Sequence, residues 1–249
     1  MEKKTKKLSL KSIILSVLGY LIWVSASIIA SQFAVVYLLY FILGRETLST
    51  PLWTTVMNAL VYLLALVLII FVPARLFKIK GWIPSREELG LRNLPTWVDL
   101  LLAPIGLILS LLLSTFLIPF LSKIFAFDLS ETQDVGYNFL NSGFDRVVAY
   151  FALCILAPIA EELIFRGFLY GKLRKKIPGK FSLFLSIFLV SLLFGILHGQ
   201  WNVGITVFCM SLVLCGLREI TGTIYSGIVL HILKNTVAFI LIYILNYSA

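Results

Sequence analysis

Residues 13–44 read IILSVLGYLIWVSASIIASQFAVVYLLYFILG, a run of 32 residues without a single Asp, Glu, Lys or Arg. A helix needs about 20 apolar residues to cross the hydrocarbon core of a bilayer, so this run is long enough to span one. The apolar core of a secretory signal peptide is much shorter, at about 7–15 residues. We therefore predict that this segment is an uncleaved first membrane helix.

More uncharged runs follow along the 249-residue chain. They lie at residues 47–74, 100–122, 147–160 and 181–217, and Lys234 is the only charged residue after Glu219. The whole chain is 60% hydrophobic and only 13% charged, which is about half the charged share of a soluble domain. This composition excludes a soluble enzyme, a disordered chain and a disulfide scaffold. The three cysteines form no CxxC motif and are interpreted as small hydrophobic residues.

These runs predict an all-α, polytopic bundle of seven membrane helices, because backbone in lipid must satisfy its own hydrogen bonds. The predicted spans are about residues 12–43, 52–75, 98–121, 147–170, 181–199, 203–217 and 222–246. We divide the chain into residues 1–122, with the first helices and a basic loop, and residues 123–249, where strongly polar residues enter the spans.

The net charge of +9 is interpreted as the positive-inside signal of a membrane protein, so the bilayer is the expected partner and nucleic acid is not. Basic residues gather in the N-terminal tail, in the loop after the second span and in the loop after the fourth. The segments between them are poorer in Lys and Arg. We predict a cytoplasmic N-terminus and an external C-terminus. The Lys-rich start and the lack of long tails favour a bacterial plasma membrane.

A first polar cluster, AEELIFRG at residues 160–167, lies in the fourth predicted span. Glu162 and Arg166 are four residues apart, so they share a helical face and can pair. Glu161 points about 100° away and is left free for chemistry. The alternative interpretation is an ion pair that only packs helices together.

Two further clusters, FGILH at residues 194–198 and HILKN at residues 231–235, contain the only histidines of the chain. The i,i+4 rule places His231 and Asn235 on one face of their helix. An intramembrane histidine can simply hold helices together. Because ionisable side chains at membrane depth are costly, however, a functional site is the default hypothesis.

These residue types suit hydrolysis of a peptide bond by direct attack of water. The sequence has no GxSxG motif, no Ser/His/Asp signature and no recognisable nucleophilic Cys, which argues against an acyl-enzyme. A Glu could take the proton of water, a His could orient the water, and His and Asn could stabilise the oxyanion. Glu161, His198 and His231 also match the ligand types of a catalytic zinc ion, although the spacing is not HExxH. Both options, no cofactor or a divalent metal, stay open on these residues.

The three clusters, in this order, resemble the EExxxR, FxxxH and HxxxN motifs of the CAAX-protease and bacteriocin-processing membrane family, also called the Abi family. Its eukaryotic relatives are the type II CAAX prenyl endopeptidases. The resemblance covers roughly residues 145–240, and the segment Glu88-Leu89-Gly90-Leu91 is similar to one that precedes the core in this family. The family is an intramembrane protease family, so the resemblance implies a CAAX-protease-like core in the C-terminal half.

The resemblance also implies roles for individual residues. Glu161 and His198 correspond to the residues that activate water, and His231 and Asn235 to those that stabilise the oxyanion. Glu162 and Arg166 correspond to supporting residues. The family is often described as metalloproteases, yet a metal-free glutamate mechanism is favoured for the prenyl endopeptidases, and we expect that mechanism here. Lys234 either reaches toward the cytoplasmic surface or partners Glu161.

The expected activity is that of an intramembrane endopeptidase. Its substrate would be a membrane-associated peptide or protein, cut in a wet cavity among the last four spans during peptide maturation or bacteriocin self-immunity. Two other classes compete with this hypothesis. One is a non-catalytic scaffold or regulator of another membrane protein, such as a sensor kinase. The other is a proton-coupled transporter, against which the absence of an inverted repeat counts.

The predicted depths of the polar residues in the membrane do not all agree. At about 1.5 Å per residue, His198 lies about 27 Å from Lys180, which is about 10 Å deeper than Glu161 and His231. A turn at residues 199–203 inside the outer leaflet would reduce this difference.

Overall fold

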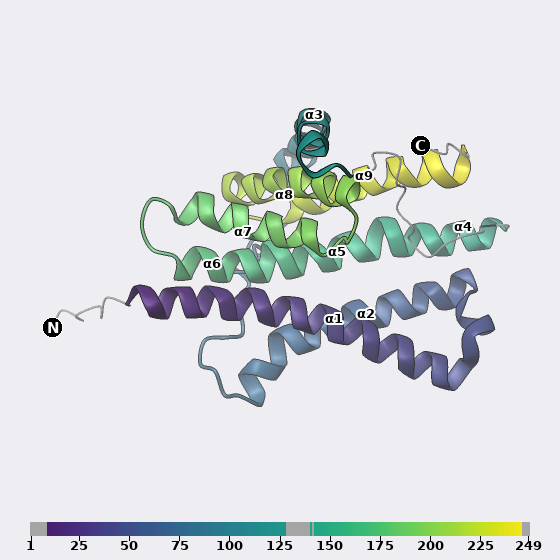
Figure 1. Ribbon diagram of the computed structural model, residues 1–249, viewed down its shortest axis with the longest axis horizontal. Coiled ribbons are helices and arrows are strands. Elements are labelled where there is room, and N and C mark those ends of the chain that lie inside the picture. Colours follow the sequence, from purple (N-terminus) through teal and green to yellow (C-terminus); the bar gives the residue numbers. More distant parts are fainter. Residues whose placement is uncertain (1–8, 128–139, 141, 246–249) are drawn as a thin grey trace.

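A computed structural model of the protein describes residues 9–127, 140 and 142–245. Every regular element in those residues is a helix, which confirms the all-α fold class (Figure 1). The N-terminal lysines 3, 4, 6 and 7 and the acidic residues Asp128, Glu131 and Asp134, which enter the charge argument, lie outside the described residues.

The first three helices are separate, and most later elements join into longer rods. The elements are α1 (Leu10–Leu48), α2 (Pro51–Arg75), α3 (Trp97–Phe125), α4 (Gly143–Tyr150), η1 (Phe151–Leu156), α5 (Ala157–Glu162), η2 (Leu163–Leu169), α6 (Tyr170–Lys176), α7 (Ser182–Ile196), α8 (Trp201–Thr221), α9 (Tyr225–Phe239) and η3 (Ile240–Ile244). The elements α4 to α6 form one continuous rod, Gly143–Lys176, and α9 continues into η3. Six helices among the described residues are long and apolar enough to cross a membrane, as an integral membrane protein requires.

The predicted fifth span, residues 181–199, differs from the other six. It forms α7, which has 15 residues and is about 22 Å long, less than the roughly 30 Å of a hydrocarbon core. α7 and α8 make a tight hairpin, because a Cβ on Gly195 would lie 2.8 Å from the carbonyl oxygen of Gly204. The turn of the hairpin lies beside α5, part-way along the Gly143–Lys176 rod (Figure 1). His198 therefore sits at the level of the glutamates, which removes the disagreement in depth.

The Gly143–Lys176 rod contains two π-helical segments, η1 and η2, on either side of α5. Pro158 lacks an N–H and cannot donate to the carbonyl of Cys154, so the regular hydrogen bonding of an α-helix is interrupted at this point. Wide turns of this kind are frequent at functional sites. The two glutamates of the first polar cluster lie on α5, between the two wide segments.

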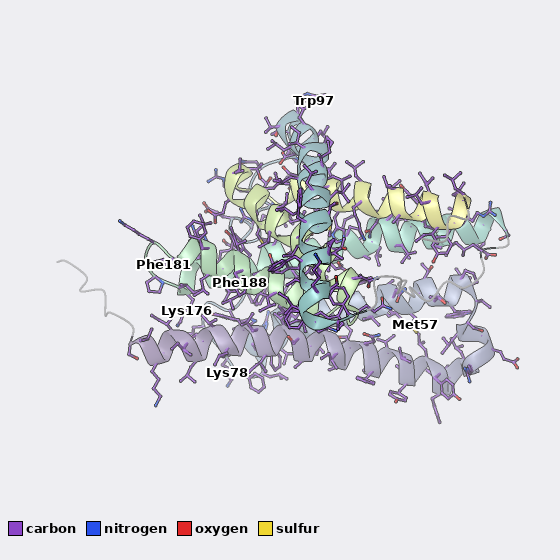
Figure 2. All side chains as sticks on the ribbon, turned by 45° about the horizontal axis from the view of Figure 1, so that its top comes forward. Met57, Lys78, Trp97, Lys176, Phe181 and Phe188 are labelled. Atoms are coloured by element: carbon purple, nitrogen blue, oxygen red, sulfur yellow. The ribbon has the colours of Figure 1, made fainter. Side chains whose placement is uncertain are left out.

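α3 runs across the other helices. It is seen almost end-on in Figure 1 and lengthwise in Figure 2, where Trp97 marks its beginning. The buried carboxylate of Asp99 accepts hydrogen bonds from Thr223 and Ser226, at 3.1 and 2.7 Å, and so ties the start of α3 to the turn between α8 and α9. A close approach at Gly106, where a Cβ would lie 2.7 Å from Leu230, continues this packing along α3.

Several basic segments meet at one end of the bundle. Glu88, in the loop after α2, pairs with Lys175 of α6, and Arg218 of α8 donates to the carbonyl oxygens of Glu87 and Glu88 at 3.2 Å. Lys78 and Lys176 point out near the same end in Figure 2. This grouping agrees with the alternation of charge in the sequence, and the assignment of that end to the cytoplasm stays a prediction.

Candidate active site

A fully buried ion pair forms the base of the site. Arg166 donates to Oε1 of Glu162 at 2.9 Å, and both side chains have 0% exposure. The guanidinium carbon of Arg166 lies 4.4 Å from the ring centroid of Phe194 on α7, a cation–π contact. The predicted pairing therefore joins the rod to α7 while it neutralises one of the two adjacent carboxylates.

His231 of α9 lies between the two glutamates. Its Nδ1 is 3.2 Å from Oε1 of Glu162, and its Nε2 is 3.7 Å from Oε2 of Glu161. A carboxylate accepts hydrogen bonds, so Nδ1 carries the proton in this geometry. Glu162 thus fixes the orientation of the ring and aims Nε2 at Glu161.

Glu161 has a partner that sequence reasoning missed. The hydroxyl of Tyr62 on α2 donates to Oε1 of Glu161 at 2.6 Å. This bond holds one carboxylate oxygen and leaves Oε2 on the side of His231. The N-terminal half of the chain therefore contributes a side chain to the site, although its spans read as almost entirely apolar.

His198 lies just after the end of α7, and a backbone carbonyl fixes the orientation of its ring. Its Nδ1 is 2.7 Å from the carbonyl oxygen of Phe194, which can only accept, so Nδ1 is the donor. In the neutral ring Nε2 is then an acceptor. The Phe194 ring contacts both imidazoles edge-on, with centroid distances of 4.8 Å to His198 and 6.1 Å to His231.

Asn235 and Lys234, the other polar residues of the HILKN cluster, have contacts that differ from those of His231. Asn235 donates from Nδ2 to the carbonyl oxygen of Leu153 in η1, at 2.8 Å, so part of its amide group joins α9 to the π-helical segment. The charge of Lys234 interacts with those of Glu161 and His198. Lys234 is half-buried, three residues after His231, and both predictions for it stay predictions.

Residues 143–237 match the family described as "Type II CAAX prenyl endopeptidase Rce1-like". This segment is therefore similar to the type II CAAX prenyl endopeptidases. It contains all three polar clusters and ends two residues after Asn235. No curated protein and no solved structure matches the chain.

A cavity of about 320 Å³ opens beside Glu161 and His198 of the matched segment. The sequence predicts a cavity among the last four spans, and the structure differs. Its walls come from the rod and from α7, as expected, but the opposite wall is made by α1 and α2. The helices that precede the matched domain therefore complete the site.

Whether Glu161, His198 and His231 could bind a metal ion depends on which of their donor atoms are open. One oxygen of Glu161 is taken by Tyr62, and the Nδ1 atoms of both histidines are taken by protein acceptors. In the part of the chain that the structure describes, no group of three His, Cys, Asp or Glu side chains could hold a metal ion. These bonds leave Oε2 of Glu161 and Nε2 of both histidines open, as they are in histidines that bind a metal through one ring nitrogen. The three side chains nevertheless form no group that could hold an ion among the described residues, and the proposed mechanism uses water without a metal.

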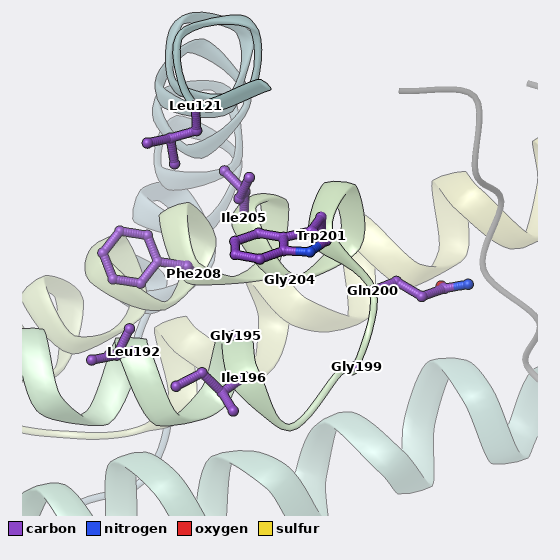
Figure 3. A pocket seen from close by; sticks show the side chains of 10 residues that line it. All are labelled: Leu121, Leu192, Gly195, Ile196, Gly199, Gln200, Trp201, Gly204, Ile205 and Phe208. Atoms are coloured by element: carbon purple, nitrogen blue, oxygen red, sulfur yellow. The ribbon is translucent and has the colours of Figure 1, made fainter. Parts of the chain in front are cut away.

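A second cavity, of about 460 Å³, lies on the side of the α7–α8 hairpin that faces α3 (Figure 3). Apolar side chains such as Leu121, Leu192 and Phe208 line most of it. None of the residues predicted to be catalytic borders this space, so the first cavity is the candidate active site.

Proposed function

We propose that this protein is an intramembrane endopeptidase that hydrolyses a peptide bond of a membrane-associated peptide or protein. The observation that carries the proposal is the position of Glu161. Its carboxylate is held by Tyr62 at 2.6 Å, faces His231 at 3.7 Å and borders the same cavity as His198. The family of the matched domain supports the reaction class.

The first step is the attack of water on the substrate carbonyl carbon. Nε2 of His198 accepts a hydrogen bond from the water and orients it, and Glu161 takes a proton from it as the general base. The new C–O bond forms as the carbonyl π electrons move to oxygen. Glu161 then gives its proton to the amide nitrogen, the C=O bond re-forms as the C–N bond breaks, and an amine and a carboxylic acid leave. The acid loses its proton to solvent.

The oxyanion of the tetrahedral intermediate needs donors, and we infer that His231 and the Asn235 amide supply them. Because Nδ1 of His231 already donates to Glu162, Nε2 carries a proton only in the imidazolium form. Glu162 is thus a positioning residue for His231, and Arg166 balances its charge.

The test uses the purified protein in lipid vesicles, incubated with a pool of peptides obtained by tryptic digestion of a bacterial proteome. New termini are read by mass spectrometry. The wild type is expected to produce them, and Glu161→Ala and His198→Ala are not. Equal cleavage by both variants, or none by the wild type, would overturn the proposal; the latter result would favour the scaffold alternative.

A chelator arm addresses the mechanism. The direct-water mechanism predicts that the wild type cleaves at an unchanged rate after treatment with 1,10-phenanthroline. Loss of cleavage that added Zn²⁺ restores would show a metal mechanism instead.

A further inference from the structure

Two side-chain amides face the cavity from the helices outside the matched domain. Gln32 of α1 and Asn58 of α2 both line the space that Glu161 and His198 border. Gln32 is exposed and Asn58 is half-buried.

Neither amide has a hydrogen-bond partner among the described residues. A primary amide in an apolar environment without such a partner costs several kcal/mol, on the order of 2–7. Within a bilayer the helix itself satisfies its backbone and offers nothing to these side chains. A polar group that enters the cavity would remove this cost.

The position of Asn58 on α2 indicates how far its amide lies from the bond to be cut. Asn58 and Tyr62 are four residues apart on α2, so they share a face and are separated by about 6 Å along the helix. An extended peptide rises about 3.3 Å per residue, so this separation equals about two residues of substrate. Since Tyr62 binds Glu161, Asn58 lies beside the backbone about two residues from the bond to be cut.

The rest of this wall is apolar. Ile28 and Val36, one turn to either side of Gln32, also line the cavity, as do Met57 and Val61 of α2. Each amide can donate to a carbonyl and accept from an N–H of a peptide unit. The surface thus offers hydrogen bonds to backbone and apolar contacts to side chains.

We propose that Gln32 and Asn58 form a backbone-binding site that holds an extended, apolar peptide segment against Glu161 and His198. The inference rests on the proposed endopeptidase function and names the residues that bind its substrate. It also gives α1 and α2 a role in recognition.

The experiment takes the most rapidly cut peptide of the tryptic pool and measures its steady-state cleavage by the vesicle-embedded protein. Gln32→Leu and Asn58→Leu remove the amides with little change in volume, and Asn58→Gln restores an amide. Leu63→Ala, on a lipid-exposed part of α2 outside the cavity, is the matched control. Each Leu variant is expected to raise KM about 3- to 10-fold, the value of one hydrogen bond, with kcat much less affected. Asn58→Gln should recover part of the loss.

Methylation of the peptide backbone provides an independent measurement. Each amide nitrogen of the same peptide is N-methylated in turn. The wild type should lose affinity most for a methyl group about two residues from the cut, and Asn58→Leu should no longer distinguish that peptide from the unmethylated one. Unchanged KM in both Leu variants, or the same methylation profile in wild type and Asn58→Leu, would overturn the inference while cleavage itself persists. Absence of wild-type cleavage would instead refute the proposed function.

Discussion

The hydroxyl of Tyr62 donates a 2.6 Å hydrogen bond to Glu161, and the two residues lie 99 positions apart in the chain. The bond crosses from α2 to the rod that carries the EExxxR motif. It makes α2 part of the geometry around the proposed general base. A site described by the three motifs alone would lack this contact.

Removing that hydroxyl is expected to lower kcat more than it changes KM. In Tyr62→Phe the carboxylate of Glu161 loses its anchor and can turn toward Lys234, so it meets the water in the right orientation less often. A hydrogen bond to a charged group contributes about 1.5 kcal/mol or more, which corresponds to a fall of about tenfold in kcat. Steady-state cleavage kinetics would measure it. Tyr40→Phe, on the exposed face of α1, is the matched control and should behave as wild type.

Substitutions in the buried Glu162–Arg166 pair should affect stability and activity differently. Glu162→Met or Arg166→Met alone leaves an uncompensated buried charge and should destabilise the protein by about 3–5 kcal/mol. The double variant should regain most of this stability, because an apolar pair can replace a buried ion pair. It should not regain cleavage, since His231 has lost the acceptor that orients it. Thermal unfolding in detergent and a cleavage assay on the same samples test this, and an active double variant would contradict the role given to Glu162.

A substitution at Gly227 tests the position of Glu162 without replacing any polar side chain. A Cβ at this position on α9 would lie 2.9 Å from Oε2 of Glu162, whereas one on Gly216 of α8 would meet nothing within 4 Å. Gly227→Ala should therefore displace Glu162 and cost about 1–3 kcal/mol, with reduced cleavage. Gly216→Ala should be neutral or slightly stabilising, because Ala favours helix. Equal behaviour of the two variants in unfolding and cleavage assays would show that Glu162 has room to move.

The contacts of the Glu88 carboxylate, at the basic end of the bundle, predict that the stability of the protein depends on pH. Partial burial raises the pKa of its carboxyl, but hydrogen bonds from Lys175 and the Ser85 backbone and the charge of Lys172 outweigh this and lower the pKa overall. A depressed folded-state pKa stabilises the protein above the unfolded value of about 4.3, and the contribution is lost as pH falls through the folded value. Wild type should unfold at a higher temperature than Glu88→Gln by a constant margin above pH ~5, and the margin should vanish in stronger acid. A margin that grows on acidification would contradict this.

Much of the fold and part of the site could be predicted from the sequence. The uncharged runs locate the helices closely, since lipid imposes a strict rule on composition, and the i,i+4 spacing of Glu162 and Arg166 predicts their ion pair. The structure also brings Glu161 and His231 together, as three motifs on separate helices require. The catalytic roles of these residues stay predictions.

Other features could not be read from the sequence. Hydropathy does not show that α7 is only 15 residues long, because a short apolar helix and a crossing one have the same composition. Tyr62 carries no motif; the only hint was a pair of polar residues, Asn58 and Tyr62, four apart in an apolar span. The bond from Asn235 to Leu153 depends on the π-helical turns near Pro158, which no periodicity in the sequence reveals.

The most direct test of the account compares purified wild type with Glu161→Gln in lipid vesicles, on one peptide that the wild type cuts. The substitution keeps the size of the side chain and its capacity to accept from Tyr62, but it removes the base. General-base catalysis contributes about 10²–10⁴-fold, so kcat should fall by at least about 100-fold while the unfolding temperature stays close to that of the wild type. A folded Glu161→Gln protein that cleaves at the wild-type rate would contradict the central claim.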